Sequence, residues 1–254
     1  MILAIDIGNT NIVIGGFEND KILFTERVST NKTATDLEYV SSVIAVMQMH
    51  SLGSECINGA IISSVVPSVT ATFKRAIEKY AGVKVMTVGP GIKTGLSIKI
   101  ENPAQLGSDL VVDAVAGINE YPVPQIIIDM GTATTMSVID KNKNYIGGII
   151  MTGIAASTEA LVSKTSQLPR IAFETPKNVI GKNTVECMKS GVMYANACAI
   201  DGLIEKIESE IGDECTIIAT GGLASSIIPL CKRNIIINDE LLLKGLMIIY
   251  NKNK

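Results

Sequence analysis

The chain has 254 residues, of which 47% are hydrophobic and 19% are charged, and it contains 22 glycines. This composition is typical of a compact globular protein and excludes an intrinsically disordered chain. The formal net charge of −3 provides no excess of basic groups to neutralise phosphates, so a nucleic-acid partner is not expected.

Export and membrane insertion are not expected either. The N-terminus has no basic region of the kind that opens a signal peptide. The longest uncharged stretches, 56–73 and 215–231, contain Pro67 and Pro229 and do not resemble membrane spans. Five cysteines without CxxC spacing fit a reducing compartment, and the single histidine, His50, leaves no His-rich metal site. We therefore expect a cytoplasmic protein.

The first half of the chain opens with two predicted strands, 2–10 and 11–17, followed by a hairpin turn at 18–21. A helix is predicted over 37–49. Another strand, 57–66, then runs into a loop of small residues that begins Ser63-Ser64, and a helical pattern follows.

The second half repeats this order. Strands are predicted at 125–132 and 133–140, a turn at 141–144, and a later strand at 216–225 that runs into Thr-Gly-Gly-Leu-Ala. Asp6 and Asp129 stand at the same point of the two copies. The alternation of short β-branched runs with longer helical patterns predicts an α/β protein. Its two copies, which open on Asp6-x-Gly8-x-Thr10 and Asp129-x-Gly131-Thr132, resemble acetate kinases, sugar kinases, Hsp70 and actin. That resemblance implies a duplicated ribonuclease H-like (actin-like ATPase) fold with two lobes and an ATP cleft between them.

The boundary between the lobes is predicted at Tyr121-Pro122-Val123-Pro124, where two prolines limit helix continuation. The expected lobes are therefore 1–121 and 122–254. The second lobe carries extra helix-rich sequence at about 153–212, an insertion of the kind that serves substrate recognition or oligomer contacts.

Two loops indicate phosphate chemistry. The strand ending at Asp6 is followed by Gly8, which lets backbone amides approach a phosphate closely. Asp6 is predicted to hold Mg²⁺ directly or through water. Such residues also form ordinary turns, but the matching loop at Asp129 and Gly131 favours a nucleotide clamp. No Walker-type phosphate loop occurs in the sequence.

Two further segments each have two interpretations. The loop Thr220–Ala224 is either an adenosine-binding loop or a strand-to-helix turn. Asp109 follows Gly107 and precedes a predicted helix, 110–118. It is either a general base for a substrate hydroxyl or an acidic residue at a helix start.

The ordered set of motifs resembles the type III pantothenate kinases over nearly the whole chain. The motifs are Asp6-x-Gly8-Asn9-Thr10, Thr94-Gly95-Leu96, Asn102-Pro103-x-x-Leu106-Gly107-x-Asp109, Asp129-x-Gly131-Thr132-Ala133-Thr134-Thr135, Gly147-Gly148-x-Ile150, Gln167-Leu168-Pro169, Asn183-Thr184 and Ser190-Gly191.

The resemblance implies that ATP phosphorylates the primary hydroxyl of pantothenate, the first step towards coenzyme A. It implies Mg²⁺ with the ATP, a monovalent cation (K⁺ or NH₄⁺) at Asp129, and a homodimer with its sites at the subunit interface. Asp109 is implied to accept the proton, and Thr132 to contact the nucleotide. The implied ATP-phosphate residues are Asp6, Ile7, Gly8, Asn9, Thr10, Asn11, Ile12 and Val13; the implied pantothenate residues are Gly107, Ser108, Asp109, Leu110 and Thr184.

Three positions depart from the family pattern. Leu110 replaces an Arg available to the substrate carboxylate, Ile100 replaces a Tyr, and Thr152-Gly153 replaces Pro-Gly. Two alternatives therefore stay open: a kinase of another small hydroxylated acid or sugar, and a nucleotide-binding regulator without catalysis.

Overall fold

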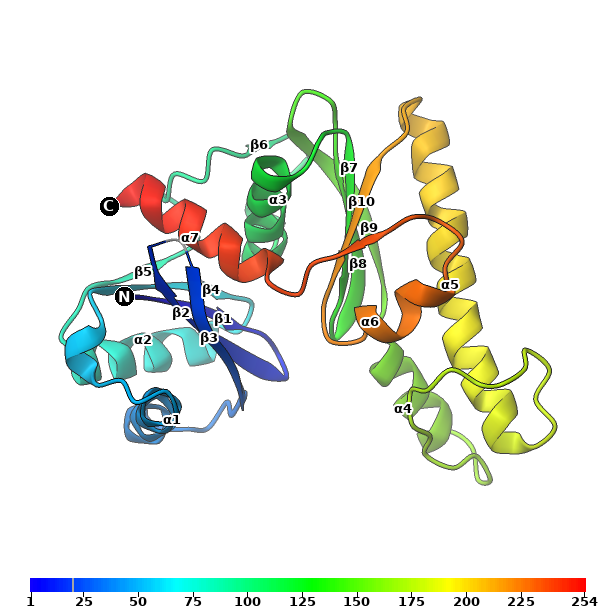
Figure 1. The fold of residues 1–254 in the computed structure, drawn as a ribbon, viewed down its shortest axis with the longest axis horizontal. Helices are drawn as coiled ribbons and strands as arrows, with labels where there is room; N and C mark the ends of the chain where they lie inside the picture. The colour runs from blue at the N-terminus through cyan, green and yellow to red at the C-terminus, as the bar shows by residue number, and fades with distance from the viewer. Residues whose placement is uncertain (20) are drawn as a thin grey trace. The chain divides into compact units, whose positions relative to one another are not determined.

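The computed structural model describes residues 1–19 and 21–254. The chain forms two compact units (Figure 1). Unit 1 consists of 1–96, 101–119 and 240–254, and unit 2 consists of 97–100 and 120–239. Within the hairpin turn predicted at 18–21, Glu18 pairs with Lys21, while Asp20 lies outside the described residues.

Unit 1 contains a five-stranded sheet in the order β3-β2-β1-β4-β5. One face packs on the helices α1 and α2 through side chains such as Ile5 and Phe73, and the other packs on α7 through side chains such as Ala4 and Leu246. The strands are β1 (Ile2–Ile7), β2 (Asn11–Glu18), β3 (Lys21–Ser29), β4 (Gly59–Ser64) and β5 (Val85–Thr87), and the helices are α1 (Asp36–Met49), α2 (Pro67–Ala81), α3 (Ser108–Glu120) and α7 (Leu241–Asn253).

Unit 2 contains a six-stranded sheet in the order β11-β10-β7-β8-β9-β6. One face of this sheet packs on the long helix α5, for example through Ile128 against Met193 and Ile200. The strands are β6 (Ser97–Ile98), β7 (Gln125–Met130), β8 (Ala133–Ile139), β9 (Asn144–Thr152), β10 (Thr216–Thr220) and β11 (Ile236–Ile237), and the helices are α4 (Ile154–Ser163), α5 (Thr184–Ile211) and α6 (Ala224–Ile227).

The two sheets repeat one topology, which confirms the predicted duplication. Each copy opens with three antiparallel strands (β1–β3 and β7–β9), and the next strand, β4 or β10, pairs in parallel with the first of them, while β6 is an addition at the edge of the second sheet. Asp6 is paired in register with Ser63, and Asp129 with Thr220. The aspartates therefore occupy equivalent positions near the carboxyl ends of equivalent strands.

The two units are not the two halves of the sequence predicted at 121/122. The C-terminal helix α7 belongs to unit 1, because Leu243 and Leu246 are buried in its core. The segment 97–100 belongs to unit 2, because β6 pairs with β9. A proline pair marks where the second copy begins, but it carries no information on where a distant apolar helix finds its partner.

Within the described residues, no helix combines the length and the apolar character needed to cross a membrane.

The close approach of α7 to α3 generates a prediction. A Cβ added at the buried Gly245 would collide with the backbone carbonyl of Val112. Alanine favours a helix over glycine by about 1 kcal/mol, but overpacking against backbone costs about 1–3 kcal/mol or more. We expect Gly245→Ala to lower the free energy of unfolding in urea. Gly89→Ala, at a loop position with nothing within 4 Å of its Cβ, should leave it unchanged or slightly raised. Equal effects of the two substitutions would contradict the close helix contact.

Candidate active site

The loop between β1 and β2 holds the predicted phosphate-binding residues 6–13 in one hairpin. The Gly8 N–H donates to the Asn11 carbonyl (3.0 Å), and the Thr30 hydroxyl donates to the Gly8 carbonyl (2.7 Å). Ile7 and Ile12 are fully buried in the core, so only their backbone is available to a ligand. The turn around Asn9 is exposed and braced from β3, as a phosphate-binding loop requires.

Asp109 lies in the first turn of α3. The Leu110 N–H donates to its Oδ1 (2.9 Å), and this carboxylate curls back over Gly107, where a Cβ would collide with it. Burial raises the pKa of Asp109, although the backbone N–H groups of Leu110 and of Asp109 itself act in the opposite direction. A carboxylate with a raised pKa is a stronger proton acceptor, which suits a general base. The structure therefore has features of both interpretations of Asp109, the helix start and the base.

A cluster of serine hydroxyls joins the Asp109 turn to β4, the strand beside the Asp6 strand. The Ser108 hydroxyl lies 3.0 Å from the Ser63 hydroxyl and 3.0 Å from both the N–H and the carbonyl of Ser64. Ser63 is the register neighbour of Asp6 on β4. The loops that carry Asp6 and Asp109 therefore meet at the same end of the unit 1 sheet. The sequence showed Ser63-Ser64 only as part of a small-residue loop and gave no sign of this contact.

In unit 2, the β7–β8 loop carries Asp129 and Thr132. The Gly131 N–H donates to the Ala133 carbonyl (3.0 Å), so this turn is one residue shorter than its counterpart in unit 1. Gly221 has a φ of 94°, and a Cβ there would lie 2.6 Å from Asp129 Oδ1. The Thr220–Ala224 segment thus passes directly beside Asp129, and only glycine fits this approach.

Gly153 plays a similar part on the other side of this loop. A Cβ at Gly153 would collide with the Thr132 carbonyl, and α4 begins directly after it. The glycine of the Thr152-Gly153 pair is therefore required by packing, whereas Thr152 is exposed.

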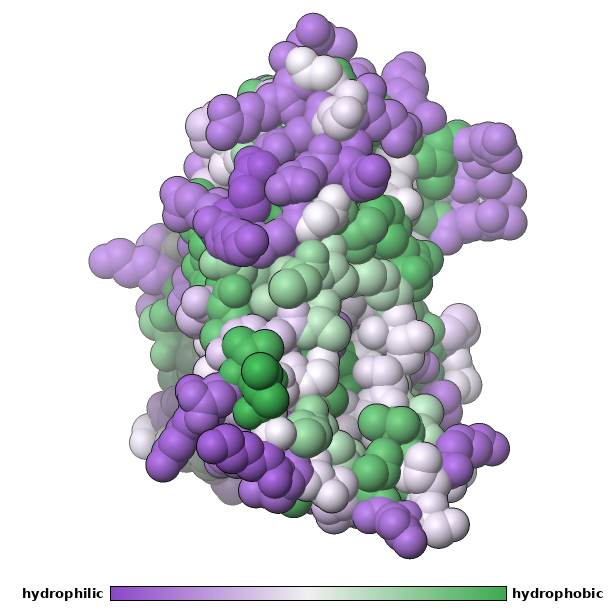
Figure 2. Space-filling model, turned by 90° about the vertical axis from the view of Figure 1, so that its right-hand side faces the viewer, coloured by the Kyte–Doolittle hydropathy of each residue, from purple (hydrophilic) through white to green (hydrophobic). Residues whose placement is uncertain are grey.

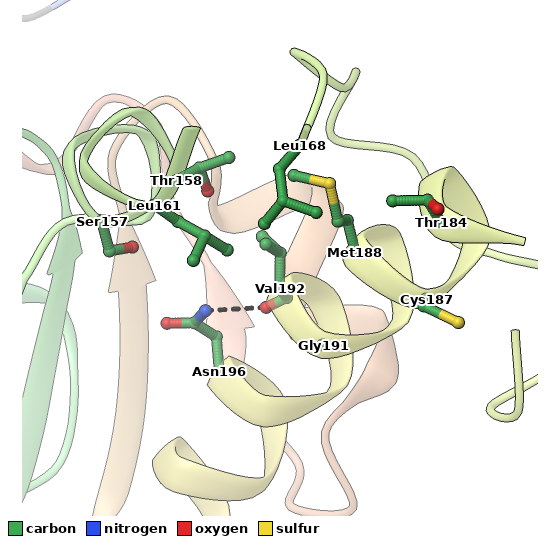
Figure 3. Close-up of a pocket in the computed structure, with 10 residues that line it drawn as sticks. All are labelled: Ser157, Thr158, Leu161, Leu168, Thr184, Cys187, Met188, Gly191, Val192 and Asn196. Carbon is green, nitrogen blue, oxygen red and sulfur yellow. Dashed lines mark hydrogen bonds between the residues drawn. The ribbon is translucent and has the colours of Figure 1, made fainter. Parts of the chain in front are cut away.

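Thr184 is the first residue of α5 in unit 2. Asn183 caps this helix through its side chain, which accepts from the Glu186 N–H (2.9 Å). Thr184 lines a cavity of about 450 Å³ between α4 and α5 (Figure 3). Apolar side chains dominate its wall, and neither Asp129 nor Thr132 is part of it. The lining residues are Ser157, Thr158, Leu161, Leu168, Thr184, Cys187, Met188, Gly191, Val192 and Asn196.

The predicted metal residues, Asp6 and Asp129, stand in different units. Across residues 1–19 and 21–254, no three His, Cys, Asp or Glu side chains gather in a group able to hold a metal ion. Carboxylate oxygens at the ends of β1 and β7 are nonetheless the donors that Mg²⁺ and other hard cations accept.

The duplicated sheets, each with an aspartate at the end of its first strand, define the actin-like ATPase fold. A similar structure is that of a putative 2-dehydro-3-deoxygalactonokinase from Sinorhizobium meliloti, with a TM-score of 0.61 at 10% identity over 99% of this chain and 96% of that one. Another is the activator of a 2-hydroxyisocaproyl-CoA dehydratase from Clostridium difficile with bound ADPNP. Its TM-score is 0.57 at 14% identity over 98% of this chain and 93% of that one.

The sequence comparisons define the family. The family model for type III pantothenate kinase matches residues 2–206. A type III pantothenate kinase from Exiguobacterium sp. is 44% identical over the full length of both chains, and one from Brevibacillus brevis is 43% identical over the full length of both. The chain belongs to the type III pantothenate kinase family.

The environment of Asp109 generates a stability prediction. Since its folded pKa is raised, ionised Asp109 costs stability at pH 7, and this cost disappears as the pH falls through the folded and then the unfolded pKa. We expect Asp109→Asn to be more stable than the wild type in urea at pH 7, with the difference shrinking towards pH 4.

Asp36 supplies a control of opposite sign. Arg75 and Lys79 hold the pKa of Asp36 at about 2, so its stabilising effect is present above the unfolded pKa and lost below it. Asp36→Asn should therefore destabilise the protein at pH 7. An Asp109→Asn protein that is less stable than the wild type at pH 7 would contradict the burial argument.

Proposed function

We propose that this protein phosphorylates the primary hydroxyl of pantothenate with ATP, giving 4'-phosphopantothenate in the first step of coenzyme A biosynthesis. The observation that carries the proposal is the half-buried Asp109 carboxylate, held in the first turn of α3, where Ser108 bonds to β4, the parallel neighbour of the Asp6 strand. Membership of the type III pantothenate kinase family supplies the substrate.

In the reaction Asp109 accepts the proton of the pantothenate hydroxyl. The hydroxyl oxygen forms a bond to the γ-phosphorus, and the bond from that phosphorus to the β,γ-bridging oxygen breaks, which releases ADP. The Leu110 N–H occupies Oδ1 of Asp109. Oδ2 is therefore the oxygen assigned to the proton.

ATP phosphate binds the loop formed by residues 6–13, where the exposed turn at Asn9 and Thr10 offers backbone and side-chain donors. Thr132, in the equivalent turn of unit 2, is the residue assigned to the nucleotide there. Asp6 would hold Mg²⁺, directly or through water, and the bound cation would supply positive charge to the phosphate oxygens.

A monovalent cation, K⁺ or NH₄⁺, is assigned to Asp129. Thr135 is its neighbour across the β7–β8 pair, on the same face of the sheet. The Thr135 hydroxyl is buried, and among the described residues it has no hydrogen-bond partner. A carboxylate beside an unused hydroxyl oxygen supports a site for an oxygen-loving cation.

Pantothenate is assigned to the loop Gly107, Ser108, Asp109 and Leu110, and to Thr184. Leu110 brings no charge to the substrate carboxylate, so backbone N–H groups of this loop are the donors assigned to it. Loss of a charged partner for the substrate carboxylate costs about 1.5–3 kcal/mol of binding free energy where nothing replaces that partner.

The protein is proposed to act as a homodimer, and the exposed face of α5 supports this. From 184 to 202 the exposed positions of α5 are uncharged and mostly small, whereas Glu186, Lys189 and Asp201 are half-buried and exposed charged residues begin at Glu205. Figure 2 views this side of unit 2 and shows hydrophobic residues gathered between hydrophilic ends. Two such helices can approach closely. The exposed α5 residues are Thr184, Val185, Cys187, Gly191, Ala195, Cys198, Ala199 and Gly202.

The activity is tested by measuring ADP release with pantothenate and with a panel of other hydroxylated acids and sugars. We expect turnover of pantothenate, and faster turnover in KCl or NH₄Cl than in NaCl. Asp109→Asn should bind ATP as the wild type does but lower kcat about 10²–10⁴-fold, the contribution typical of a general base. Turnover of another acceptor alone would indicate a different kinase, and ATP binding without turnover of any acceptor would indicate a regulator.

The dimer is tested by light scattering of wild-type protein and of Ala195→Glu, which adds a charge to the uncharged face of α5. We expect a dimeric wild type and a monomeric variant, because an unpaired charge at a packed helix interface strongly opposes association. Ser209→Glu adds the same charge at an exposed position of α5 beyond that face and should stay dimeric. A monomeric wild type would contradict the proposal.

A further inference from the structure

Ser63 and Ser108 lie between Asp6 and Asp109, the two carboxylates that have separate roles in the proposed reaction. Ser63 lies on β4 as the register neighbour of Asp6 on β1, and strands of one sheet run about 4.8 Å apart. Ser108 immediately precedes Asp109, and the two serine oxygens are 3.0 Å apart. The order in space is therefore Asp6, Ser63, Ser108, Asp109.

The Ser108 hydroxyl is bonded to β4 at three points. Its oxygen accepts from the Ser64 N–H (3.0 Å), and it lies 3.0 Å from both the Ser64 carbonyl and the Ser63 hydroxyl. A hydroxyl has one proton to donate, so Ser108 donates to one of these two oxygens, and either serine can be the donor in the bond between them. The Ser108 hydroxyl is thus fully occupied by β4, and its oxygen is turned towards protein.

The surroundings of this pair are rigid. Ser63 is fully buried. The Ser64 hydroxyl accepts from the Val66 N–H (3.0 Å), and the Val65 N–H donates to the Ile7 carbonyl (3.1 Å). The end of β4 is therefore fixed to the end of β1, and Ser108 fixes the start of α3 to both.

We infer that Ser63 and Ser108 form a positioning pair that sets the place of Asp109 relative to the Asp6 phosphate loop. This inference rests on the proposed function and extends it. The pair does not touch the reacting atoms. It keeps the proton acceptor at the separation from the phosphate loop that in-line attack needs, where an error of about 1 Å can cost about 10²-fold in rate.

The test compares kcat, the KM for ATP and the melting temperature of Ser108→Ala, Ser108→Thr and Ser63→Ala with wild type. We expect Ser108→Ala to lower kcat about 10–100-fold, with the KM for ATP within about twofold, because the loop around Gly8 is intact. Ser108→Thr keeps the oxygen and should restore most of kcat. Ser41→Ala, which removes a hydroxyl bonded to the Leu37 carbonyl within α1, is the matched control and should behave as wild type.

The double variant Ser63→Ala/Ser108→Ala separates a joint role from two separate ones. If the serines act as one unit, the double variant is no slower than the slower single variant; multiplied losses would overturn the pair. A folded Ser108→Ala protein with wild-type kcat, or an equal loss with threonine, would also overturn it. If Ser108→Ala does not fold, Ser63→Ala alone decides by the same kcat criterion.

The proposed function fails on different results. A wild type without pantothenate turnover, or an Asp109→Asn protein with full turnover, counts against the reaction itself. Serine variants as active as an active wild type count against the positioning pair alone.

Discussion

Each unit depends on the parallel pairing of its first strand with the strand that returns after the opening hairpin, β1 with β4 and β7 with β10. Parallel pairing places the carboxyl ends of both strands at one edge of the sheet. The aspartate near the end of the first strand then lies beside a hydroxyl residue of the second, Asp6 beside Ser63 and Asp129 beside Thr220. Each loop assigned to phosphate or cation binding leaves its sheet from such an edge, so the pairing decides where the chemistry is placed.

Most of the fold could be predicted from local patterns in the sequence. The strands at Ile2–Ile7 and Gln125–Met130, the helix at Asp36–Met49 and the repeat of one unit were all predicted from hydrophobic period and turn residues. The residues that specify these elements lie within the elements or a few positions from their ends. The two ends of α5 are also set locally. Asn183 caps its start through a side-chain hydrogen bond, and the left-handed Gly212 ends it.

Contacts between distant segments were not predictable in this way. Ser63 and Ser108 are 45 positions apart, and no sequence pattern around either serine indicates that the other is its partner. The C-terminal helix packs in unit 1, where Gly245 lets it approach the α3 backbone at Val112. A glycine within a helical pattern does not indicate which segment the helix will pack against. Asp109 was predicted as a residue, but its burial and its link to β4 came only from the folded chain.

Helix α5 combines two tasks that the sequence left separate. Its Asn183 cap fixes the first turn and so the position of Thr184, while none of its exposed positions from 184 to 202 is charged. A residue assigned to the substrate thus stands at one end of a surface assigned to a second subunit. In the proposed dimer, a shift of α5 at that surface moves Thr184 with it, because a helix is a rigid element, so the proposal links association to acceptor binding.

The leucine at position 110 affects the base as well as the substrate. A guanidinium next to Asp109 would favour the ionised carboxylate and lower its pKa. Leu110 supplies only its backbone N–H to Oδ1, and the net effect of burial is a raised pKa. In the proposed reaction, the exchange of Arg for Leu removes a cationic partner of the pantothenate carboxylate and leaves Asp109 more basic than a neighbouring guanidinium would. The first effect would weaken substrate binding and the second would favour proton transfer, so the two would act on different steps.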